Sequence, residues 1–125
     1  MTRILLAEDE QPMRDYLARA LERSGYEVVA VDRGTKAAPL LEQEHFDLLL
    51  TDIVMPEMDG IALARHCNHV SPGTEVMFIT GFSAVALRAG EAMPNAKVLS
   101  KPFHLRDLVL EVERLFAKES FGELK

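Results

Sequence analysis

The sequence predicts an α/β fold, a doubly wound five-stranded parallel sheet in the order 2-1-3-4-5. Strand-like and helix-like hydrophobic periods alternate along the 125 residues and form five β–α units. The first, third and fourth strand segments are continuously apolar, which is typical of strands buried on both faces. Right-handed crossovers between such strands place helices on both sides of one sheet. The start of a β/α barrel is the other common winding, but at this length the open sheet is favoured.

The first half of the chain contains three predicted strands and two predicted helices. They span residues 4–7, 13–23, 27–31, 35–44 and 46–51, in the order strand, helix, strand, helix, strand. Pro12 suits the first helical turn, where its missing N–H would have no partner. Gly25 suits the C-terminal cap of the first helix. Pro39 predicts a distortion inside the second helix.

The second half continues the alternation with three helices and two strands. A helix opens at Asp59-Gly60 and runs through Cys67, and Gly60 is expected to supply backbone freedom at its start. A strand over residues 74–80, a helix over 83–92 and a strand over 96–100 follow. The last helix is expected to end near residue 117. Its apolar face consists of Leu105, Leu108, Val109, Val112, Leu115 and Phe116.

The composition is that of one globular domain, which we place at residues 1–117, with a short tail at 118–125 and no output domain. The net charge of −6 disfavours nucleic-acid binding. A single cysteine, Cys67, leaves no disulfide framework and favours a reducing compartment. The N-terminus lacks a signal-peptide layout, and no apolar run approaches the ~20 residues of a membrane span. We therefore expect a cytoplasmic protein without membrane contact.

Polar side chains stand where the predicted strands end. Strand 1 ends at Glu8-Asp9, strand 3 at Asp52, strand 4 at Thr80-Gly81 and strand 5 at Lys101-Pro102. In an open sheet of this order, ligands bind beyond the carboxyl ends of the strands, at the switch point between strands 1 and 3. The sequence therefore predicts that these side chains converge on one edge of the sheet.

The predicted cluster suits phosphoryl transfer onto a carboxylate. Three carboxylates, from Glu8, Asp9 and Asp52, repel each other, and a hard divalent cation with oxygen ligands, such as Mg²⁺, relieves this repulsion. Lys101 adds a positive charge and Thr80 a hydroxyl group. A metal ion and a lysine together can neutralise the transferring oxygens, which leaves little covalent chemistry to the protein.

Taken together, these residues resemble the receiver domains of bacterial two-component response regulators, which have a flavodoxin-like (βα)5 fold. The resemblance covers residues 3–117. It rests on Glu8-Asp9, Asp52, Met55-Pro56, Asp59-Gly60, Thr80 and Lys101-Pro102-Phe103, in this order and at the ends of the right strands.

The resemblance implies a role for each site residue. Asp52 would accept a phosphoryl group from a phosphohistidine, so the partner would be a histidine kinase or a histidine phosphotransfer protein. Asp9 would bind Mg²⁺ directly and Glu8 through water, while Asp52 and the main-chain carbonyl of Val54 would complete the protein ligands. Thr80 and Lys101 would bind the phosphoryl oxygens as catalytic groups. The resemblance also implies a cis peptide bond between Lys101 and Pro102.

One position departs from the family. Receivers usually carry an aromatic switch residue three positions before the lysine, and here that position is Val98. The coupling of a threonine to an inward-turning ring is therefore not expected. Thr80 and the loop after it would have to carry the signal in another way.

A finer resemblance is to the stand-alone CpdR-type group of alphaproteobacteria. It rests on residues 4–9, 48–60, 78–82 and 98–108. It implies a place in a cell-cycle phosphorelay, in which the unphosphorylated form acts as an adaptor that delivers substrates to the ClpXP protease. On this interpretation the protein is a signalling switch and not a conventional enzyme, although it assists its own phosphorylation and dephosphorylation. We expect a monomer or a weak homodimer.

Other readings remain open at the level of sequence. A magnesium-dependent aspartyl phosphatase usually needs a second acid two positions after the nucleophile, where this chain has Val54. A constitutive interaction module with a vestigial site is the second alternative. His66 and His69 share a helix face, but no further ligand accompanies them, and a solvated helix with Cys67 turned inward is favoured. In the tail, Phe121 and Leu124 could form a partner contact, although a frayed tail is the default.

Two apolar residues stand where the family controls the access of water to the acyl phosphate. They are Val54 and Phe82, each two positions after a site residue. We expect from them a fairly long-lived phosphorylated form.

Overall fold

The protein is represented by a computed structural model, which describes the backbone of residues 1–124 and the side chains of residues 1–82 and 84–117. Five strands and five helices alternate strictly along these described residues. The strands form one sheet in the order β2-β1-β3-β4-β5, and all neighbouring pairs are parallel. The fold class and strand order predicted from the sequence are confirmed.

The central strand is β3 (Leu48–Asp52), and β1 (Arg3–Ala7) lies between it and the edge strand β2 (Glu27–Val31). Beyond β3 follow β4 (Glu75–Thr80) and the edge strand β5 (Lys97–Ser100). The register pairs Ala7 with Thr51 and Thr80 with Ser100. The strands thus end nearly level with one another, and the residues that follow them meet at one edge.

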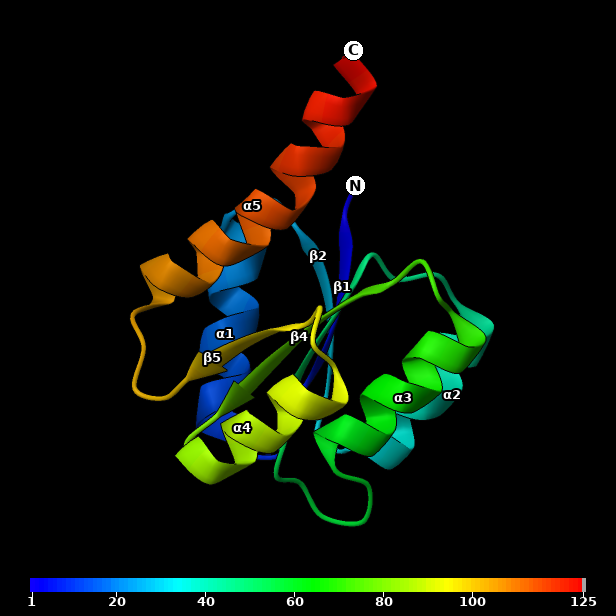
Figure 1. Cartoon of the computed structure of the whole chain (residues 1–125). Coiled ribbons are helices and arrows are strands. Elements are labelled where there is room, and N and C mark those ends of the chain that lie inside the picture. Colours follow the sequence, from blue (N-terminus) through cyan, green and yellow to red (C-terminus); the bar gives the residue numbers. More distant parts are fainter. Residues whose placement is uncertain (125) are drawn as a thin grey trace.

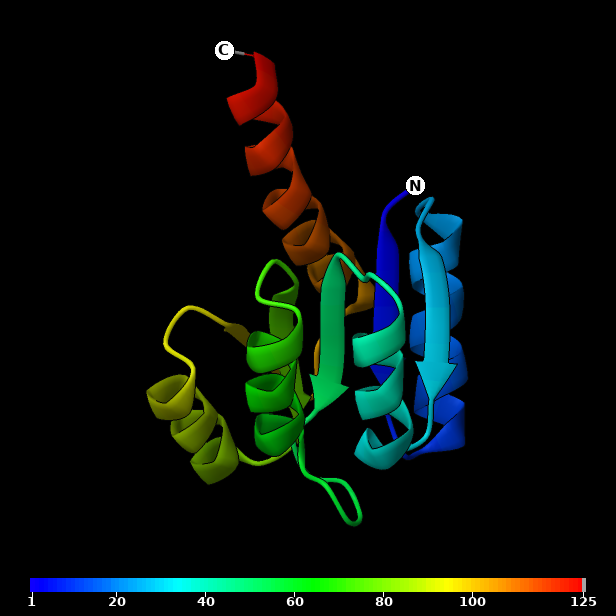
Figure 2. The same cartoon turned by 90° about the vertical axis from the view of Figure 1, so that its right-hand side faces the viewer.

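The helices cover both faces of the sheet (Figures 1 and 2). One face carries α1 (Gln11–Arg23) and α5 (Leu105–Leu124). The other carries α2 (Gly34–Gln43), α3 (Gly60–Val70) and α4 (Ser83–Ala92). Pro39 lies inside α2, where its ring removes one intrahelical hydrogen bond.

Each face of the sheet has its own hydrophobic core. Leu6, Leu50 and Ile79 point toward α1 and α5, while Leu49 and Phe78 point toward α2, α3 and α4. The central strands are buried on both sides, as their continuous apolar sequence predicts. Each fully buried Leu, Ile or Phe side chain contributes about 1.5–3 kcal/mol, so this double core holds the polar edge in place.

The last helix differs from the prediction. The sequence indicates an end near residue 117, whereas α5 continues to Leu124 and extends past the edge of the sheet at which the strands begin (Figure 1). The division into a receiver domain at 1–117 and a tail stays a prediction. The side chains of Phe121 and Leu124, considered as a partner contact, lie outside the described residues. Within residues 1–124, neither α5 nor any other helix combines the length and apolarity needed to cross a bilayer.

Candidate functional site

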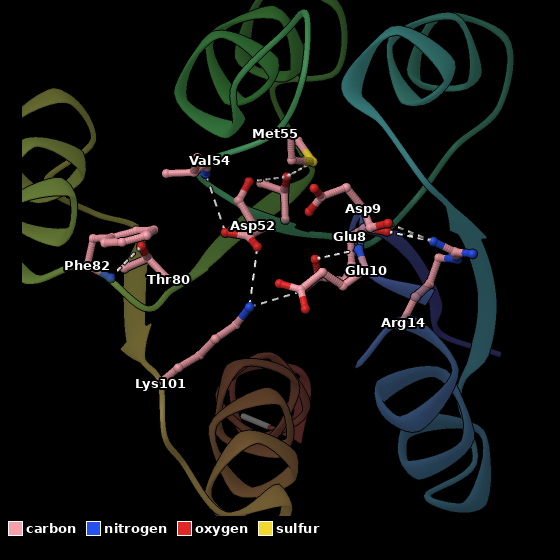
Figure 3. A network of polar contacts seen from close by, with 11 residues as sticks. Glu8, Asp9, Glu10, Arg14, Asp52, Val54, Met55, Thr80, Phe82 and Lys101 are labelled. Atoms are coloured by element: carbon pink, nitrogen blue, oxygen red, sulfur yellow. Dashed lines mark hydrogen bonds and ion pairs between the residues drawn. The ribbon is translucent and has the colours of Figure 1, made fainter. Parts of the chain in front are cut away.

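The side chains that follow four different strands meet at the carboxyl edge of the sheet (Figure 3). Glu8 and Asp9 follow β1, and Asp52 ends β3. Thr80 ends β4, and Lys101 follows β5. These are the residues that the sequence places at strand ends, and the structure brings them together as predicted.

Lys101 connects two of the acids. Its Nζ donates to Oε1 of Glu8 at 3.2 Å and to Oδ2 of Asp52 at 3.3 Å, although these partners lie 93 and 49 positions away in sequence. The peptide bond between Lys101 and Pro102 is cis, in agreement with the prediction. The main-chain N–H of Lys101 donates to the carbonyl of Thr80 at 2.6 Å, which fixes the start of this loop against β4.

Burial sets the electrostatics of this cluster. Glu8 is fully buried, and the side chain of Asp52 is only 8% exposed. Burial, reinforced by the nearby charge of Asp52, raises the pKa of Glu8 to about 7. Burial alone would lower the pKa of Lys101, but the carboxylates of Asp52 and Glu8 outweigh it and raise this pKa above its ordinary value. The ammonium group of Lys101 therefore stays protonated between the two acids.

The three carboxylates together suit a divalent cation. Glu8, Asp9 and Asp52 each offer one carboxylate oxygen, and these oxygens lie within 4.8 Å of one another. Lys101 supplies one positive charge against three potential negative charges, and two of the acids are buried. Such a set of oxygen donors with excess negative charge is what hard cations such as Mg²⁺ prefer.

The loop between β3 and α3 is packed tightly against the central acid. The N–H of Val54 donates to Oδ1 of Asp52 at 3.3 Å, and the N–H of Gly60 donates to the carbonyl of Ile53 at 2.7 Å. A Cβ at position 60 would lie 2.1 Å from the carbonyl oxygen of Asp52. The sequence predicts that Gly60 supplies backbone freedom, and this explanation is wrong. A glycine is needed here because the backbone at Gly60 comes too close to that of Asp52 for a side chain. Asp59 caps α3 by accepting from the N–H of Ala62 at 2.8 Å, which confirms the predicted start of this helix.

Thr80 is connected to the loop that follows β4. Its hydroxyl group is fully buried and accepts from the N–H of Phe82 at 3.2 Å. Val98, at the usual position of the aromatic switch, is partly buried against the core beneath α4. Phe82, by contrast, is 59% exposed. The aromatic ring near the site is therefore already on the surface, and it is joined to Thr80 by one main-chain hydrogen bond.

Arg14 lies next to the site and was not predicted from the sequence. Its Nη1 donates to the carbonyl oxygen of Glu8 at 3.0 Å and lies 3.5 Å from that of Asp9 (Figure 3). A signal for it exists in the sequence, because Arg14 is the fourth residue of α1, where a positive charge opposes the helix dipole. A cation in this unfavourable place indicates a specific partner.

A second missed feature is Glu57, which has a φ of 68° in the β3–α3 loop. Its carboxylate lies 3.4 Å from Nη1 of Arg33, which precedes α2. The N–H of Met58 donates to the carbonyl of Pro56 at 2.8 Å, so the chain turns tightly around Glu57. Left-handed backbone is rare for a residue with a Cβ.

The histidines of α3 form no metal site. Among the described residues, the acids Glu8, Asp9 and Asp52 are the single group of three or more potential ligands close enough to share an ion. Nε2 of His66 lies 3.5 Å from the carboxylate of Glu42 on α2. Cys67 is fully buried, which confirms the predicted inward orientation, and burial raises its pKa to about 11.

Comparison with known proteins agrees with this geometry. The family model described as response regulator receiver domain matches residues 4–113. The response regulator receiver protein CpdR of Brucella abortus is 59% identical over 116 residues, which cover 92% of this chain and 97% of CpdR. The sensor kinase CckA of the same organism is 34% identical over 120 residues, which cover 93% of this chain but 13% of CckA.

A solved structure with the same fold carries a ligand. The response regulator protein TrrA of Thermotoga maritima, in complex with Mg²⁺–BeF, is 27% identical and superposes with a TM-score of 0.79. The match covers 92% of this chain and 99% of TrrA. Sequence, fold and site geometry agree: the chain belongs to the family of response regulator receiver domains and resembles its CpdR-type members.

Proposed function

We propose that this receiver accepts a phosphoryl group on Asp52 from a phosphohistidine, in a reaction that requires Mg²⁺. The observation that carries the proposal is the placement of the Lys101 ammonium between Glu8 and Asp52 at 3.2 and 3.3 Å. A lysine held there can turn from Asp52 to an incoming phosphoryl oxygen without leaving the site. The Mg²⁺–BeF complex of the related protein TrrA supports the choice of cation and of a phosphate-like ligand.

In the proposed reaction an oxygen of Asp52 forms the new P–O bond. The P–N bond to the donor imidazole breaks, and its electron pair stays on the nitrogen. The carboxylates of Glu8, Asp9 and Asp52 and the carbonyl of Val54 would hold Mg²⁺, which when bound neutralises charge on the transferring oxygens. The lysine would bind one phosphoryl oxygen, and the hydroxyl group of Thr80 would donate to another.

The surface beside Lys101 suits the approach of the donor. A mainly apolar pocket of about 380 Å³ opens there, lined by Met13, Tyr16, Gly81, Lys101, Pro102 and Phe103. Tyr16 on α1 is 57% exposed. A histidine kinase or histidine phosphotransfer protein that docks on this pocket would bring its phosphohistidine close to Lys101 and Asp52.

The output is proposed to pass through Thr80 and Phe82. When the Thr80 hydroxyl group turns to a phosphoryl oxygen, its hydrogen bond from the Phe82 N–H has to rearrange. This shifts the first turn of α4 and the exposed ring of Phe82. Phosphorylation would in this way change which protein binds to the surface around α4.

The downstream role is proposed from the CpdR-type resemblance. The unphosphorylated form would act as an adaptor that delivers substrates to the ClpXP protease, within a cell-cycle phosphorelay. The 59% identity to CpdR over nearly the full length of both chains supports this role. A pull-down of ClpXP with both phosphorylation states tests it, and equal capture by both states would leave a constitutive interaction module.

The phosphorylated form is proposed to be fairly long-lived. Val54 and Phe82 are apolar and 48% and 59% exposed, so neither can orient a water molecule for attack on the acyl phosphate. Replacing Val54 with Asn is expected to shorten the lifetime, by up to roughly tenfold, the low end of what a water-orienting group contributes. A wild-type half-life of seconds in magnesium buffer would contradict the proposal.

The central experiment uses acetyl phosphate with Mg²⁺ and intact-mass measurement. The wild type is expected to gain one phosphoryl group, and Asp52→Ala none. Omitting Mg²⁺, or adding a chelator, should suppress the adduct on the wild type. An equal adduct on Asp52→Ala, or none on the wild type, would refute Asp52 as the acceptor. Release of inorganic phosphate from small phosphate esters, with turnover, would instead favour the phosphatase reading.

A further inference from the structure

We infer that Arg14 is a positioning residue for the metal-binding carboxylates. It holds the turn that carries Glu8 and Asp9 by binding the main-chain carbonyls of both residues. This inference rests on the proposed function, since it assumes that the acids bind Mg²⁺, and it adds a residue to the machinery of that site.

The side chain of Arg14 contacts main-chain carbonyl groups and no carboxylate among the described residues. Within the described residues, Arg3, Arg33 and Arg114 each form an ion pair with a carboxylate, whereas Arg14 forms none. Its Nη1 instead lies 3.0 Å from the Glu8 carbonyl and 3.5 Å from the Asp9 carbonyl. The guanidinium therefore does not occupy the carboxylate oxygens of Glu8 and Asp9.

Two further hydrogen bonds hold the turn. The N–H of Glu10 donates to Oε2 of Glu8 at 3.2 Å, and the N–H of Glu8 donates to the carbonyl of Val31 at 3.1 Å. Arg14 itself begins the regular hydrogen bonding of α1, because its N–H donates to the Glu10 carbonyl at 2.9 Å. The half-buried side chain of Arg14 thus connects the first turn of α1 to the end of β1.

The positive charge of Arg14 is by itself unfavourable at this position. A positive charge in the first turn of a helix opposes the helix dipole. A positive charge near a divalent cation weakens the binding of that cation. Because both general effects are unfavourable, the hydrogen bonds to the two carbonyls are the contribution that the structure offers for Arg14.

These two effects have opposite signs in a binding experiment, which makes the inference testable. If Arg14 acted only through its charge, Arg14→Met would remove repulsion and tighten Mg²⁺ binding. If Arg14 positions the acids, the same substitution should weaken binding by about tenfold, the lower range seen for residues that orient metal ligands. Arg14→Lys keeps the charge but offers one compact ammonium group, so its affinity should lie between those of the wild type and Arg14→Met.

The experiment measures Mg²⁺ dissociation constants by isothermal titration calorimetry, and the unfolding free energy without metal by urea. Arg19→Met is the matched control, because Arg19 lies exposed on the same helix and forms no hydrogen bond or ion pair in the described part of the chain. It removes the same net charge, and its dissociation constant is expected to stay within twofold of the wild type.

Amide NMR chemical shifts report independently on the conformation of the turn formed by Glu8, Asp9 and Glu10. In Arg14→Met the amides of Glu8, Asp9 and Glu10 are expected to shift before Mg²⁺ is added, while those of the β3–α3 loop stay unchanged. If Arg14→Met does not fold, Arg14→Lys carries the test, and weaker binding by a folded Arg14→Lys protein supports the positioning role.

The outcomes separate the inference from the proposed function. Wild-type protein that binds no Mg²⁺ would refute the proposed metal site. Wild-type protein that binds Mg²⁺, with Arg14→Met and Arg14→Lys binding equally well or more tightly, would refute the role of Arg14 alone.

Discussion

Two clusters of charge lie at opposite edges of the same sheet, and they contain nearly the same groups. We call Glu8, Asp9, Asp52 and Lys101 the acceptor cluster; it lies where the strands end. The Arg3 cluster, which lies where the strands begin, consists of Arg3, Glu27, Glu44 and Asp47. Each cluster combines three carboxylates with one long cationic side chain drawn from distant parts of the sequence.

The clusters differ in exposure. In the Arg3 cluster the carboxylate side chains are 52%, 42% and 34% exposed. Arg3 pairs with Glu27 and Glu44, its N–H donates to Asp47 at 2.8 Å, and its guanidinium lies 4.6 Å from the Phe46 ring centre. In the acceptor cluster, Glu8 and Asp52 have side-chain exposures of 0% and 8%.

This contrast indicates that burial, and not the number of charges, distinguishes the proposed phosphorylation site from an exposed group of ion pairs. Water solvates the excess negative charge of the Arg3 cluster, and exposed ion pairs of this kind contribute little. In the acceptor cluster Asp9 is exposed, but Glu8 and Asp52 are buried, and burial together with the nearby charge of Asp52 raises the pKa of Glu8 to about 7. The excess negative charge of these carboxylates favours a bound cation.

The largest expected effect comes from Glu8→Gln in metal-free protein. The folded pKa of Glu8 is raised from 4.5 to about 7, so the folded state holds a proton that the unfolded chain releases between these pH values. Its contribution to stability is therefore present below pH 4.5 and is lost as the pH rises toward 7. Glu8→Gln should remove this pH dependence, which is on the order of 2–3 kcal/mol.

Urea unfolding at pH 5 and pH 8, with a chelator present, measures this difference. Glu27→Gln is the matched control in the Arg3 cluster, and its exposed carboxylate should leave the wild-type pH dependence nearly unchanged. Saturating Mg²⁺ at pH 8 should stabilise the wild type more than Glu8→Gln. If both variants keep the wild-type pH dependence, burial does not distinguish the clusters.

A second comparison uses one glycine near each edge of the sheet. Gly60→Ala should lower the unfolding free energy by about 1–3 kcal/mol, because the new Cβ would lie 2.1 Å from the Asp52 carbonyl oxygen. Gly73→Ala, just before β4, places its Cβ with nothing within 4 Å and should be tolerated. Phosphoryl uptake from acetyl phosphate should fall for Gly60→Ala alone. If both variants are equally stable, the backbone at position 60 can move away from Asp52 without a loss of unfolding free energy, and the prediction is wrong.

Much of the acceptor cluster could be predicted because hydrophobic patterns reveal where strands end. Once the strands are parallel and ordered 2-1-3-4-5, their ends must share one edge, which places Asp52 near Thr80 and Lys101. Residues that act through side chains at strand ends are thus open to sequence reasoning. The resemblance to receivers then assigned a role to each of them.

Features that depend on main-chain contacts were not predictable in the same way. Arg14 binds carbonyl oxygens, which every residue possesses, so no sequence pattern marks its partners. The close approach behind Gly60 depends on the path of a loop, and hydrophobic periodicity says nothing about it. The length of α5 was underestimated because its apolar stripe ends before the helix does.

A smaller effect is expected from Arg3→Met in the Arg3 cluster. The substitution removes the exposed ion pairs and the contact of the guanidinium with Phe46, while the methionine keeps most of the apolar packing. The midpoint of thermal unfolding should fall by roughly 5 °C or less. Phosphoryl uptake should remain at the wild-type rate, and a loss of uptake without a loss of fold would show that the two edges are coupled.

The smallest effect is expected at Glu57, whose backbone is left-handed in the β3–α3 loop. Glu57 adopts a φ of 68°, which is unfavourable by about 1 kcal/mol for a residue with a Cβ but not for glycine. Glu57→Gly removes this strain together with an exposed contact to Arg33 at 3.4 Å, which contributes little. The net expectation is a gain of about 0.5–1 kcal/mol in the urea-derived unfolding free energy. Glu57→Gln, which keeps the strain and loses the charge, is the control and should not gain stability. If Glu57→Gly gains no stability either, the left-handed backbone at Glu57 is not a net cost to the folded protein, and the prediction is wrong.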